Sequence, residues 1–356
     1  MRTIIIAAVI LVAIILATYG VTRLFGNAGK PVRINARPAD NIQAFGESVV
    51  FYDGLALHCV NKNGNTDWQY ALGTDGDFYC SKNMVVAWTG NQMIVFNKDG
   101  QTTYTDRMDE PILFARVGET YVAACVGSSE LASSVRVMNH TGSLIDPISF
   151  TDLFILDVGF FSTKEQLMWV LALDINGNSP ITNLSTYEPG SRSTGAVDLQ
   201  DQLVYKVYLH NNNLMAVDTT KIRTFNYKCV EQTDLSSILA YGWQVKDVRS
   251  IGRNTYALME QMPSSGNLTS FSELRLISNY QVQSLRLLSP CFASGLSDKG
   301  VYGFSANTIY FAPYGSNAFK GTQLNYTISD LICTLDGSRA VIATGDDVFI
   351  IQLPTS

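Results

Sequence analysis

The stretch Leu57-His58-Cys59-Val60-Asn61-Lys62-Asn63-Gly64 is a short apolar strand that runs into a polar turn ending at glycine. The same pattern returns at Met93–Gly100, Val135–Gly142 and Leu171–Gly177. The glycines of successive copies lie 36, 42 and 35 residues apart. Such a period, built from short strands and tight turns, is typical of a β-propeller blade. The repeat therefore predicts an all-β propeller.

Extending this pattern over residues 42–356 predicts eight blades. Their inner strands should begin near Ile42, Phe78, Ile112, Phe154, Val204, Val245, Phe292 and Ser329. The longer units in the second half indicate insertions, which we expect at Thr182–Leu203, Glu231–Tyr241 and Met262–Phe271. Seven blades stay possible, because the unit around Asp152–Leu203 is irregular.

The end of the chain holds three predicted strands, over Ser329–Leu335, Ala340–Thr344 and Asp347–Leu353. A blade needs four strands. The fourth could come from the start of the chain, around Val32–Ala36, which would join the two ends and remove a free sheet edge.

The N-terminus holds an unbroken apolar run, Ile4–Ala17, which extends to Val21. Eighteen helical residues span about 27 Å, close to the thickness of a hydrocarbon core. We therefore expect a tail at 1–3, a transmembrane anchor at 4–21, a juxtamembrane linker with a possible closing strand at 22–41, and a propeller at 42–356. A cleavable signal peptide is the alternative, with Gly26-Asn27-Ala28 as its candidate cleavage site.

The orientation of this span depends on two opposing signals. A short tail followed by a long polar domain favours a signal anchor with the body outside the cytoplasm. The basic residues Arg23, Lys30 and Arg33 after the span favour the opposite orientation. We expect a single-pass membrane protein whose bulk is extracytoplasmic.

Charge excludes one class of function. The first 29 residues contain two basic and no acidic side chains, so the rest carries 23 basic and 31 acidic side chains, a formal charge of −8. A nucleic-acid binder needs basic patches that displace counterions from phosphates. We therefore expect no nucleic-acid partner.

Six cysteines are present, and none forms a C-x-x-C or adjacent pair. Most lie inside apolar runs, as Cys125 does, which predicts buried free thiols rather than a disulfide framework. The even number leaves disulfides as the alternative for an exported protein. The six are Cys59, Cys80, Cys125, Cys229, Cys291 and Cys333.

The repeat resembles that of quinoprotein-type (PQQ-like) propellers, in which a strand end leads through a turn to a tryptophan. Here Trp68 follows the first turn, Val95–Gly100 is followed by Tyr104, and Ala216–Thr220 by Phe225. Over roughly residues 42–353 the chain also resembles an uncharacterised family of single-span, membrane-anchored propeller-like proteins of Gram-positive anaerobes. Enzymes among the quinoproteins use a vicinal cysteine pair, a tryptophan floor and carboxylates that bind calcium.

The residues do not fit that cofactor chemistry. No two cysteines are adjacent, and the four tryptophans occupy positions where they would pack between sheets. We expect no cofactor. The tryptophans are Trp68, Trp88, Trp169 and Trp243.

Paired carboxylates are the other candidate chemistry, because sugar-cleaving propellers need two acids close together in the central funnel. Asp157, Asp247 and Glu260 border apolar strands and are the candidates. An ion pair or turn contact beside Arg249 explains Asp247 equally well. A converging pair would favour an enzyme, whereas an aromatic face without such a pair would favour binding.

Metal chemistry has little support. The histidines His58, His140 and His210 are isolated and lack ligand-like spacing. Asp346-Asp347 could hold calcium, but turn chemistry suffices to explain it. We predict no catalytic, cofactor-binding or metal-binding residues.

These observations favour a non-enzymatic binding or scaffolding module of the cell envelope. Its loops around 182–203 and 262–271 would hold an envelope protein or a cell-wall polymer. The alternative is an extracytoplasmic glycan-acting enzyme, a hydrolase or lyase, that uses carboxylates in the funnel. Aromatic residues beside turns, Tyr187 and Tyr310–Tyr314, could add to a binding face, although blade packing is the simpler role for them.

Overall fold

The computed structural model describes residues 30–128, 132–161, 166–200, 202–236, 238–262 and 270–356. The segment 4–21, for which the sequence predicts a membrane span, lies outside these residues. None of the helices within the described ranges has both the length and the apolar character needed to cross a bilayer.

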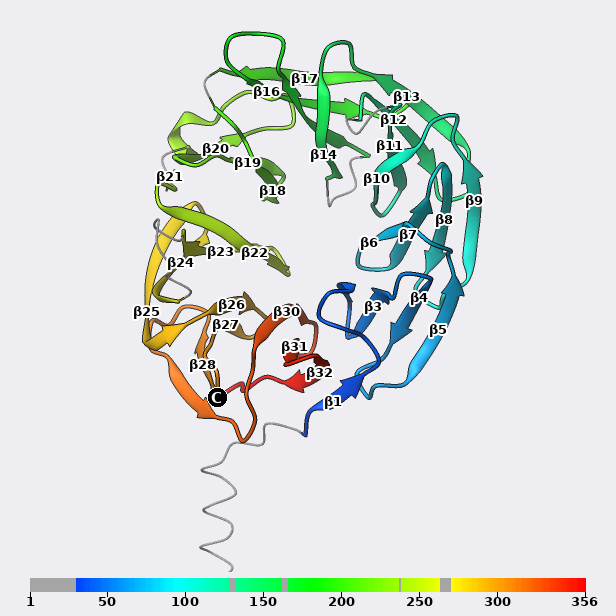
Figure 1. The fold of residues 1–356 in the computed structure, drawn as a ribbon. Helices are drawn as coiled ribbons and strands as arrows, with labels where there is room; N and C mark the ends of the chain where they lie inside the picture. Colours follow the sequence, from blue (N-terminus) through cyan, green and yellow to red (C-terminus); the bar gives the residue numbers. More distant parts are fainter. Residues whose placement is uncertain (1–29, 129–131, 162–165, 201, 237, 263–269) are drawn as a thin grey trace, which may run out of the picture.

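The described residues form eight antiparallel four-stranded sheets arranged as a ring, with the first strand of each sheet toward its centre in blades 1 to 8 (Figure 1). This confirms the prediction of an eight-bladed propeller over the seven-bladed alternative. Every inner strand begins within two residues of its predicted position.

The strands are as follows, from the inner to the outermost strand of each blade. Blade 1 consists of β2 (Asn41–Phe45), β3 (Ser48–Tyr52), β4 (Ala56–Val60) and β5 (Thr66–Ala71). Blade 2 consists of β6 (Gly76–Cys80), β7 (Met84–Thr89), β8 (Gln92–Asn97) and β9 (Thr102–Arg107). Blade 3 consists of β10 (Ile112–Val117), β11 (Tyr121–Val126), β12 (Ser134–Asn139) and β13 (Leu144–Ser149). Blade 4 consists of β14 (Phe154–Phe160), β15 (Met168–Asp174), β16 (Ile181–Glu188) and β17 (Arg192–Leu199).

Blade 5 consists of β18 (Lys206–His210), β19 (Asn213–Val217), β20 (Lys221–Phe225) and β21 (Ile238–Leu239). Blade 6 consists of β22 (Trp243–Ile251), β23 (Asn254–Gln261), β24 (Phe271–Ser278) and β25 (Gln281–Cys291). Blade 7 consists of β26 (Ala293–Leu296), β27 (Gly300–Phe304), β28 (Thr308–Pro313) and β29 (Lys320–Gln323). Blade 8 consists of β30 (Asp330–Leu335), β31 (Arg339–Thr344), β32 (Asp347–Gln352) and β1 (Val32–Ile34), and a short 3₁₀ helix, η1 (Thr233–Leu235), lies in blade 5.

Blade 8 closes the ring with strands from both ends of the described chain. β1 pairs antiparallel with β32, with Val32 opposite Ile350 and Ile34 opposite Val348. The sequence placed a possible closing strand in this segment. The pairing covers the edge of β32 that would otherwise be unpaired.

The strand pattern follows from burial. β11 is buried along its whole length, because neighbouring blades pack on both faces of its sheet. The outermost strands β5 and β9 instead alternate between exposed and half-buried residues. Apolar clusters between successive blades form the core, and each draws residues from two adjacent sheets.

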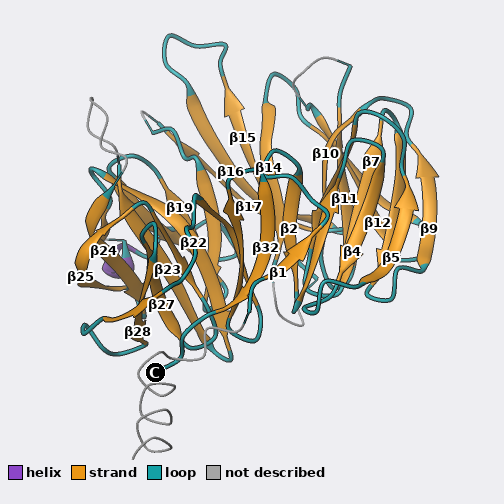
Figure 2. Ribbon diagram, turned by 60° about the horizontal axis from the view of Figure 1, so that its bottom comes forward, coloured by secondary structure: helices purple, strands orange, loops and turns teal. Residues whose placement is uncertain are grey.

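The propeller has two faces (Figure 2). The upper face carries the connections between blades and the turns between the second and third strands of each blade. The lower face carries the turns between the first and second strands and between the third and fourth strands. The outermost strands run from the lower to the upper face, so Lys30, which precedes β1, lies at the lower face.

Two details of the predicted repeat are wrong. The Leu171–Gly177 copy ends β15 and forms an upper-face turn, whereas the other three copies end third strands at the lower face. The predicted insertion at 182–203 is largely β16 and β17, regular strands of blade 4. The loop expected at 262–271 joins β23 to β24, and its residues 263–269 lie outside the described residues.

The lower-face turns share one geometry. In blade 2 the side-chain Oδ1 of Asn97 accepts hydrogen bonds from the backbone N–H groups of Asp99 and Gln101, both at 3.0 Å. Gly100 completes the turn with φ of +75°, a conformation that favours glycine. The same turn recurs at Asn61, at Asn139 and, unrecognised in the sequence, at Asn226.

Gly100 also contacts blade 1, because it leaves room for a side chain of that blade to pack on the turn. A Cβ atom at Gly100 would lie 2.3 Å from Cγ of Trp68, the indole that packs over the turn from β5. The Trp68 ring stacks on Phe96 with centroids 5.6 Å apart. The aromatic residue after the turn therefore fastens one blade to the next.

We expect Gly100→Ala to lower the free energy of unfolding by about 2–4 kcal/mol, because it adds a collision with Trp68 to a left-handed backbone. Gly90→Ala is the matched control. Gly90 has φ of +56° in the same blade, but no atom lies within 4 Å of its Cβ position. Its cost should stay at about 1–2 kcal/mol. Urea unfolding followed by tryptophan fluorescence measures the unfolding free energy of both variants. Equal losses would contradict the role given to the packing of Trp68 over Gly100.

The prediction of free thiols is confirmed, because all six cysteines are unpaired. Cys59, Cys125, Cys229 and Cys291 are buried, whereas Cys80 and Cys333 are half-buried on inner strands. Burial raises the pKa of the Cys59 and Cys333 thiols to about 12. Such thiols are poor nucleophiles at neutral pH.

Candidate functional site

The inner strands face the centre of the ring, and each has one edge without a strand partner. At β6 and β26, side chains of the preceding blade cover this edge. In blade 1, Gln43 accepts a hydrogen bond from the N–H of Cys80 at 3.0 Å and donates one to the carbonyl of Phe78 at 2.8 Å. An amide side chain thus replaces a missing strand neighbour.

Two of the predicted carboxylates serve the same purpose on β26. Oδ2 of Asp247 accepts the N–H of Leu296 at 2.8 Å. Oε1 of Glu260 accepts both the N–H and the hydroxyl of Ser294, at 2.9 and 2.8 Å. The structure therefore brings Asp247 and Glu260 to one strand edge, where each caps a backbone donor.

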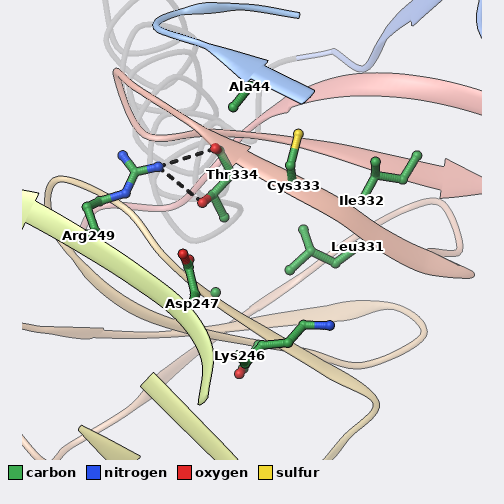
Figure 3. Close-up of a pocket in the computed structure, with 10 residues that line it drawn as sticks. Ala44, Lys246, Asp247, Arg249, Leu331, Ile332, Cys333 and Thr334 are labelled. Carbon is green, nitrogen blue, oxygen red and sulfur yellow. Dashed lines mark hydrogen bonds between the residues drawn. The ribbon is translucent and has the colours of Figure 1, made fainter. Parts of the chain in front are cut away.

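A pocket of about 320 Å³ opens beside this edge, between blades 6, 7, 8 and 1 (Figure 3). Asp247 and Lys246 line it, whereas Glu260 is buried behind Ser294. Arg249 enters from β22 and donates to the carbonyl and the hydroxyl of Thr334, both at 3.2 Å (Figure 3). The pocket also exposes Cys333 of β30.

The third predicted acid has a different neighbour. Asp157 forms an ion pair with Arg116 of blade 3 at 2.9 Å. Burial raises the pKa of Asp157, and the Arg116 charge opposes this rise. Asp157 is not among the residues that line the pocket beside Asp247.

Burial also raises the pKa of Glu260, while its hydrogen bonds from Ser294 lower it. An acid whose pKa is higher in the folded state binds protons more tightly when folded. The folded protein thus loses stability as the pH rises from 4.5 through the folded-state pKa of Glu260.

A buried carboxylate with a raised pKa suits a general acid, but a second acid must face the same ligand. Only Asp247 of this pair lines the pocket.

We expect Glu260→Gln to match or exceed the parent in unfolding free energy at pH 7. The glutamine oxygen can still accept both bonds from Ser294, and the cost of burying a charge is gone. Below pH 4.5, where Glu260 is protonated, the difference should vanish. Glu260→Ala should lose about 1–3 kcal/mol at both pH values, because it leaves the Ser294 donors unpaired. Urea unfolding at pH 7 and pH 4 tests this, and a large loss for Glu260→Gln at pH 7 would contradict it.

The histidines have structural neighbours. His58 lies 2.8 Å from Asp53, His140 lies 3.1 Å from the carbonyl of Gly118, and buried His210 packs edge-on against Tyr280. Across the described ranges, no three histidine, cysteine or acidic side chains are grouped to hold a metal ion. Trp88, Trp169 and Trp243 are buried, as predicted for packing residues.

A cluster of exposed apolar side chains lies on the upper face at blades 5 and 6. Tyr241 is 82% exposed and Leu239 is 71% exposed. Leu203, Tyr205 and Met262 complete what we call the upper apolar patch. Hydrogen bonds join its three segments. The N–H of Met262 donates to the carbonyl of Gly242, which follows Tyr241, and the hydroxyl of Tyr205 accepts the N–H of Val245 in blade 6.

The sequence did not single out this patch, because its members come from three separate connections. The aromatic residues named instead are mostly packed. Tyr187 is half-buried against Phe150, Tyr314 stacks on Tyr256 with centroids 3.9 Å apart, and Phe311 is buried.

Exposed carboxylates also lie on the upper face, but away from the patch. They stand at the junctions between blades 1 to 4 and in blade 8, and they are Asp75, Asp109, Asp152, Asp330 and Asp346. At the patch itself, Arg275 donates a hydrogen bond to the carbonyl of Leu239 at 3.3 Å.

Residues 30–248 match the model of a family of unknown function, DUF5711. No curated protein matches the sequence. Among solved structures, the chain is similar to Sqt1 of Saccharomyces cerevisiae, with a TM-score of 0.57 and 9% identity over 92% of this chain and 99% of that one. It is also similar to KlHsv2 with loop 6CD replaced by a Gly-Ser linker, with a TM-score of 0.51 and 10% identity over 80% and 96%. BamB of Moraxella catarrhalis gives a TM-score of 0.49 and 8% identity over 92% and 99%. At these identities the likeness concerns the fold alone.

Proposed function

We propose that this chain, which belongs to the DUF5711 family of unknown function, is a membrane-tethered, non-enzymatic module that binds a partner protein on its upper face. The observation that carries the proposal is the upper apolar patch. Large exposed apolar and tyrosine side chains that gather on one face are typical of protein contact surfaces. The rigid ring holds them in place without a folding cost on binding.

The chemistry of the patch supports a protein as the partner. Its exposed side chains are aliphatic or tyrosine, which match an apolar area on another protein. We therefore favour an envelope protein over a polymer as the partner.

The predicted anchor at 4–21 supports the location of this module. It would hold the body at the membrane, outside the cytoplasm, and raise the local concentration of the module near envelope partners. Lys30 leaves the propeller at the lower face, so the upper face would point away from the bilayer.

The arrangement of the acids supports a binding role over a glycan-acting enzyme. Asp247 and Glu260 each accept backbone hydrogen bonds from β26, and Glu260 is buried. Hydrolysis needs two acids that face one ligand. The edge-capping role explains both residues without catalysis.

The test is in-cell crosslinking with the full-length anchored protein, followed by mass spectrometry of the captured proteins. The variant Leu239→Ser with Tyr241→Ser should lower capture of a specific envelope protein at least tenfold, because central aromatic and aliphatic contacts contribute most of the binding energy. Leu55→Ser is the matched control: Leu55 is 62% exposed on the same face, in blade 1, outside the patch.

Reproducible capture that is lost only in the patch variant supports the proposal. Capture that survives the patch variant, or an empty result with the parent, would refute it. Capture of wall fragments instead of protein would identify the polymer as the ligand.

A further inference from the structure

The junction between blades 4 and 5 is packed differently from the junctions that precede blades 1 to 3. In blades 1 to 3, a turn glycine packs beneath a side chain from the outermost strand of the preceding blade: Gly64 beneath Val32, Gly100 beneath Trp68, and Gly142 beneath Tyr104. In blade 5 the turn carries Cys229, with φ of +55°, and the glycine, Gly195, lies on the outermost strand β17. A Cβ at Gly195 would lie 2.2 Å from the carbonyl oxygen of Lys228.

The close approach at Gly195 fixes the turn against blade 4. The carbonyl of Tyr227 accepts hydrogen bonds from the hydroxyls of Thr186 at 2.7 Å and Thr194 at 3.3 Å. Within the turn, Oδ1 of Asn226 accepts the N–H of Lys228 at 2.9 Å. The backbone that carries Tyr227 and Lys228 is therefore held from both sides.

A pocket of about 330 Å³ lies at this junction on the lower face. Its lining consists of Arg192, Ser193, Thr194, Tyr227 and Lys228. It thus combines two cations, two hydroxyls and one aromatic ring.

The two cations are weakly paired within the protein. Nε of Arg192 lies 3.7 Å from Glu188, and the Arg192 side chain is 74% exposed, so this ion pair contributes little. The ammonium of Lys228 lies 5.6 Å from the centroid of the Tyr227 ring. No acidic side chain of the described ranges lies within 4 Å of that ammonium.

We propose that this pocket binds the phosphate group of an organic phosphate. A guanidinium and an ammonium that line one pocket match a group with several charged oxygens, and the hydroxyls supply neutral donors. The Tyr227 ring would lie against the organic part of the ligand. Because the body of the chain carries a net charge of −8, the site must overcome a repelling field, and its affinity should fall steeply with salt.

The position of the pocket suggests where such a phosphate would come from. It lies on the face at which β1 begins, where the exposed cations Lys98 and Arg253 also lie, whereas Lys62 is paired with Glu47 at 2.6 Å. If residues 4–21 anchor the chain, as proposed above, this face lies against lipid head groups. A phospholipid head group and a soluble phosphate ester share the same chemistry, and experiment can separate them.

The test uses the full chain in neutral detergent and isothermal titration with two probes, inorganic phosphate and glycerophosphoglycerol. The site variant is Arg192→Gln with Lys228→Gln, and it should bind both probes at least tenfold more weakly than the parent. The control, Lys98→Gln with Arg253→Gln, removes the same charge from the same face outside the pocket. Its affinity should stay within twofold of the parent.

Tighter binding of glycerophosphoglycerol than of inorganic phosphate would support the site and assign it to lipid head groups. Equal or tighter binding of inorganic phosphate would keep the phosphate site, assign it to soluble phosphates and rule out the contact between Tyr227 and an organic part. No saturable binding by the parent, or an equal loss in both double variants, would overturn the proposal. Circular dichroism confirms that the variants keep the fold, and the proposal does not depend on the upper apolar patch.

Discussion

Ile34→Asp should unfold the ring, with a loss of about 4 kcal/mol or more in unfolding free energy. Ile34 lies in the closing strand β1, is 3% exposed and packs in the cluster between blades 8 and 1. The change removes a buried aliphatic side chain and places a carboxylate in an apolar interior, and both effects act in the same direction. We expect a lower urea midpoint and increased protease sensitivity of the last blade.

The neighbouring residue supplies the control. Arg33 pairs with Asp347 at 2.6 Å across the same two strands, but both side chains are substantially exposed. Arg33→Ala should cost no more than about 1 kcal/mol. If Ile34→Asp were as mild as Arg33→Ala, β1 would not be required to close the ring.

The blade positions could be predicted because one chemical pattern fixes them. An apolar strand must end where the chain turns, and asparagine with glycine three residues later forms the turn with its own backbone bonds. Asn97 and Gly100 show this arrangement directly. The same pattern misled at Leu171–Gly177, because Asp174 also accepts a backbone bond, from Asn176, in a turn on the opposite face. Turn chemistry identifies a turn but not the face on which it lies.

Blade 4 was misread for a different reason. β16 contains the buried polar residues Thr182, Ser185 and Thr186, which lack the apolar pattern of a core strand. Thr186 is nevertheless well placed there, because its hydroxyl donates to the carbonyl of Tyr227 in the next blade. Burial of a polar side chain depends on that distant partner, which the local sequence does not reveal.

The candidate sites depend on the same kind of distant contact. Asp247 was recognised as unusual, but its partner is a backbone N–H of Leu296 in another blade. The upper apolar patch takes its members from three separate segments of the chain, so the local sequence does not show that Leu203, Tyr241 and Met262 lie on one face. Sequence indicated the charged residues of the inner strands but not the surface that we propose for binding.

Arg249→Met should lower the free energy of unfolding by about 2–3 kcal/mol, because Arg249 links three blades. From β22 of blade 6 its guanidinium lies 2.8 Å from Asp298 of blade 7 and 3.1 Å from Asp336 of blade 8, in addition to its bonds to Thr334. Asp336 also donates its N–H to the carbonyl of Gly46 in blade 1, which extends the connection across the closure. Without the arginine, two carboxylates face one another without a cation between them.

Salt separates this electrostatic effect from a loss of packing. Repulsion between Asp298 and Asp336 is screened by ions, since both side chains are partly exposed, whereas a packing defect is not. Raising the ionic strength to about 1 M, where screening acts within about 3 Å, should therefore recover part of the loss in Arg249→Met. Arg249→Lys should recover little at low salt, because one ammonium cannot reproduce the planar set of donors. Arg253→Met, an exposed arginine in the turn after the same strand, should change the unfolding free energy by less than about 0.5 kcal/mol. A salt-independent loss in Arg249→Met would mean that Arg249 acts through packing, and a loss no larger than that of Arg253→Met would remove it from the closure of the ring.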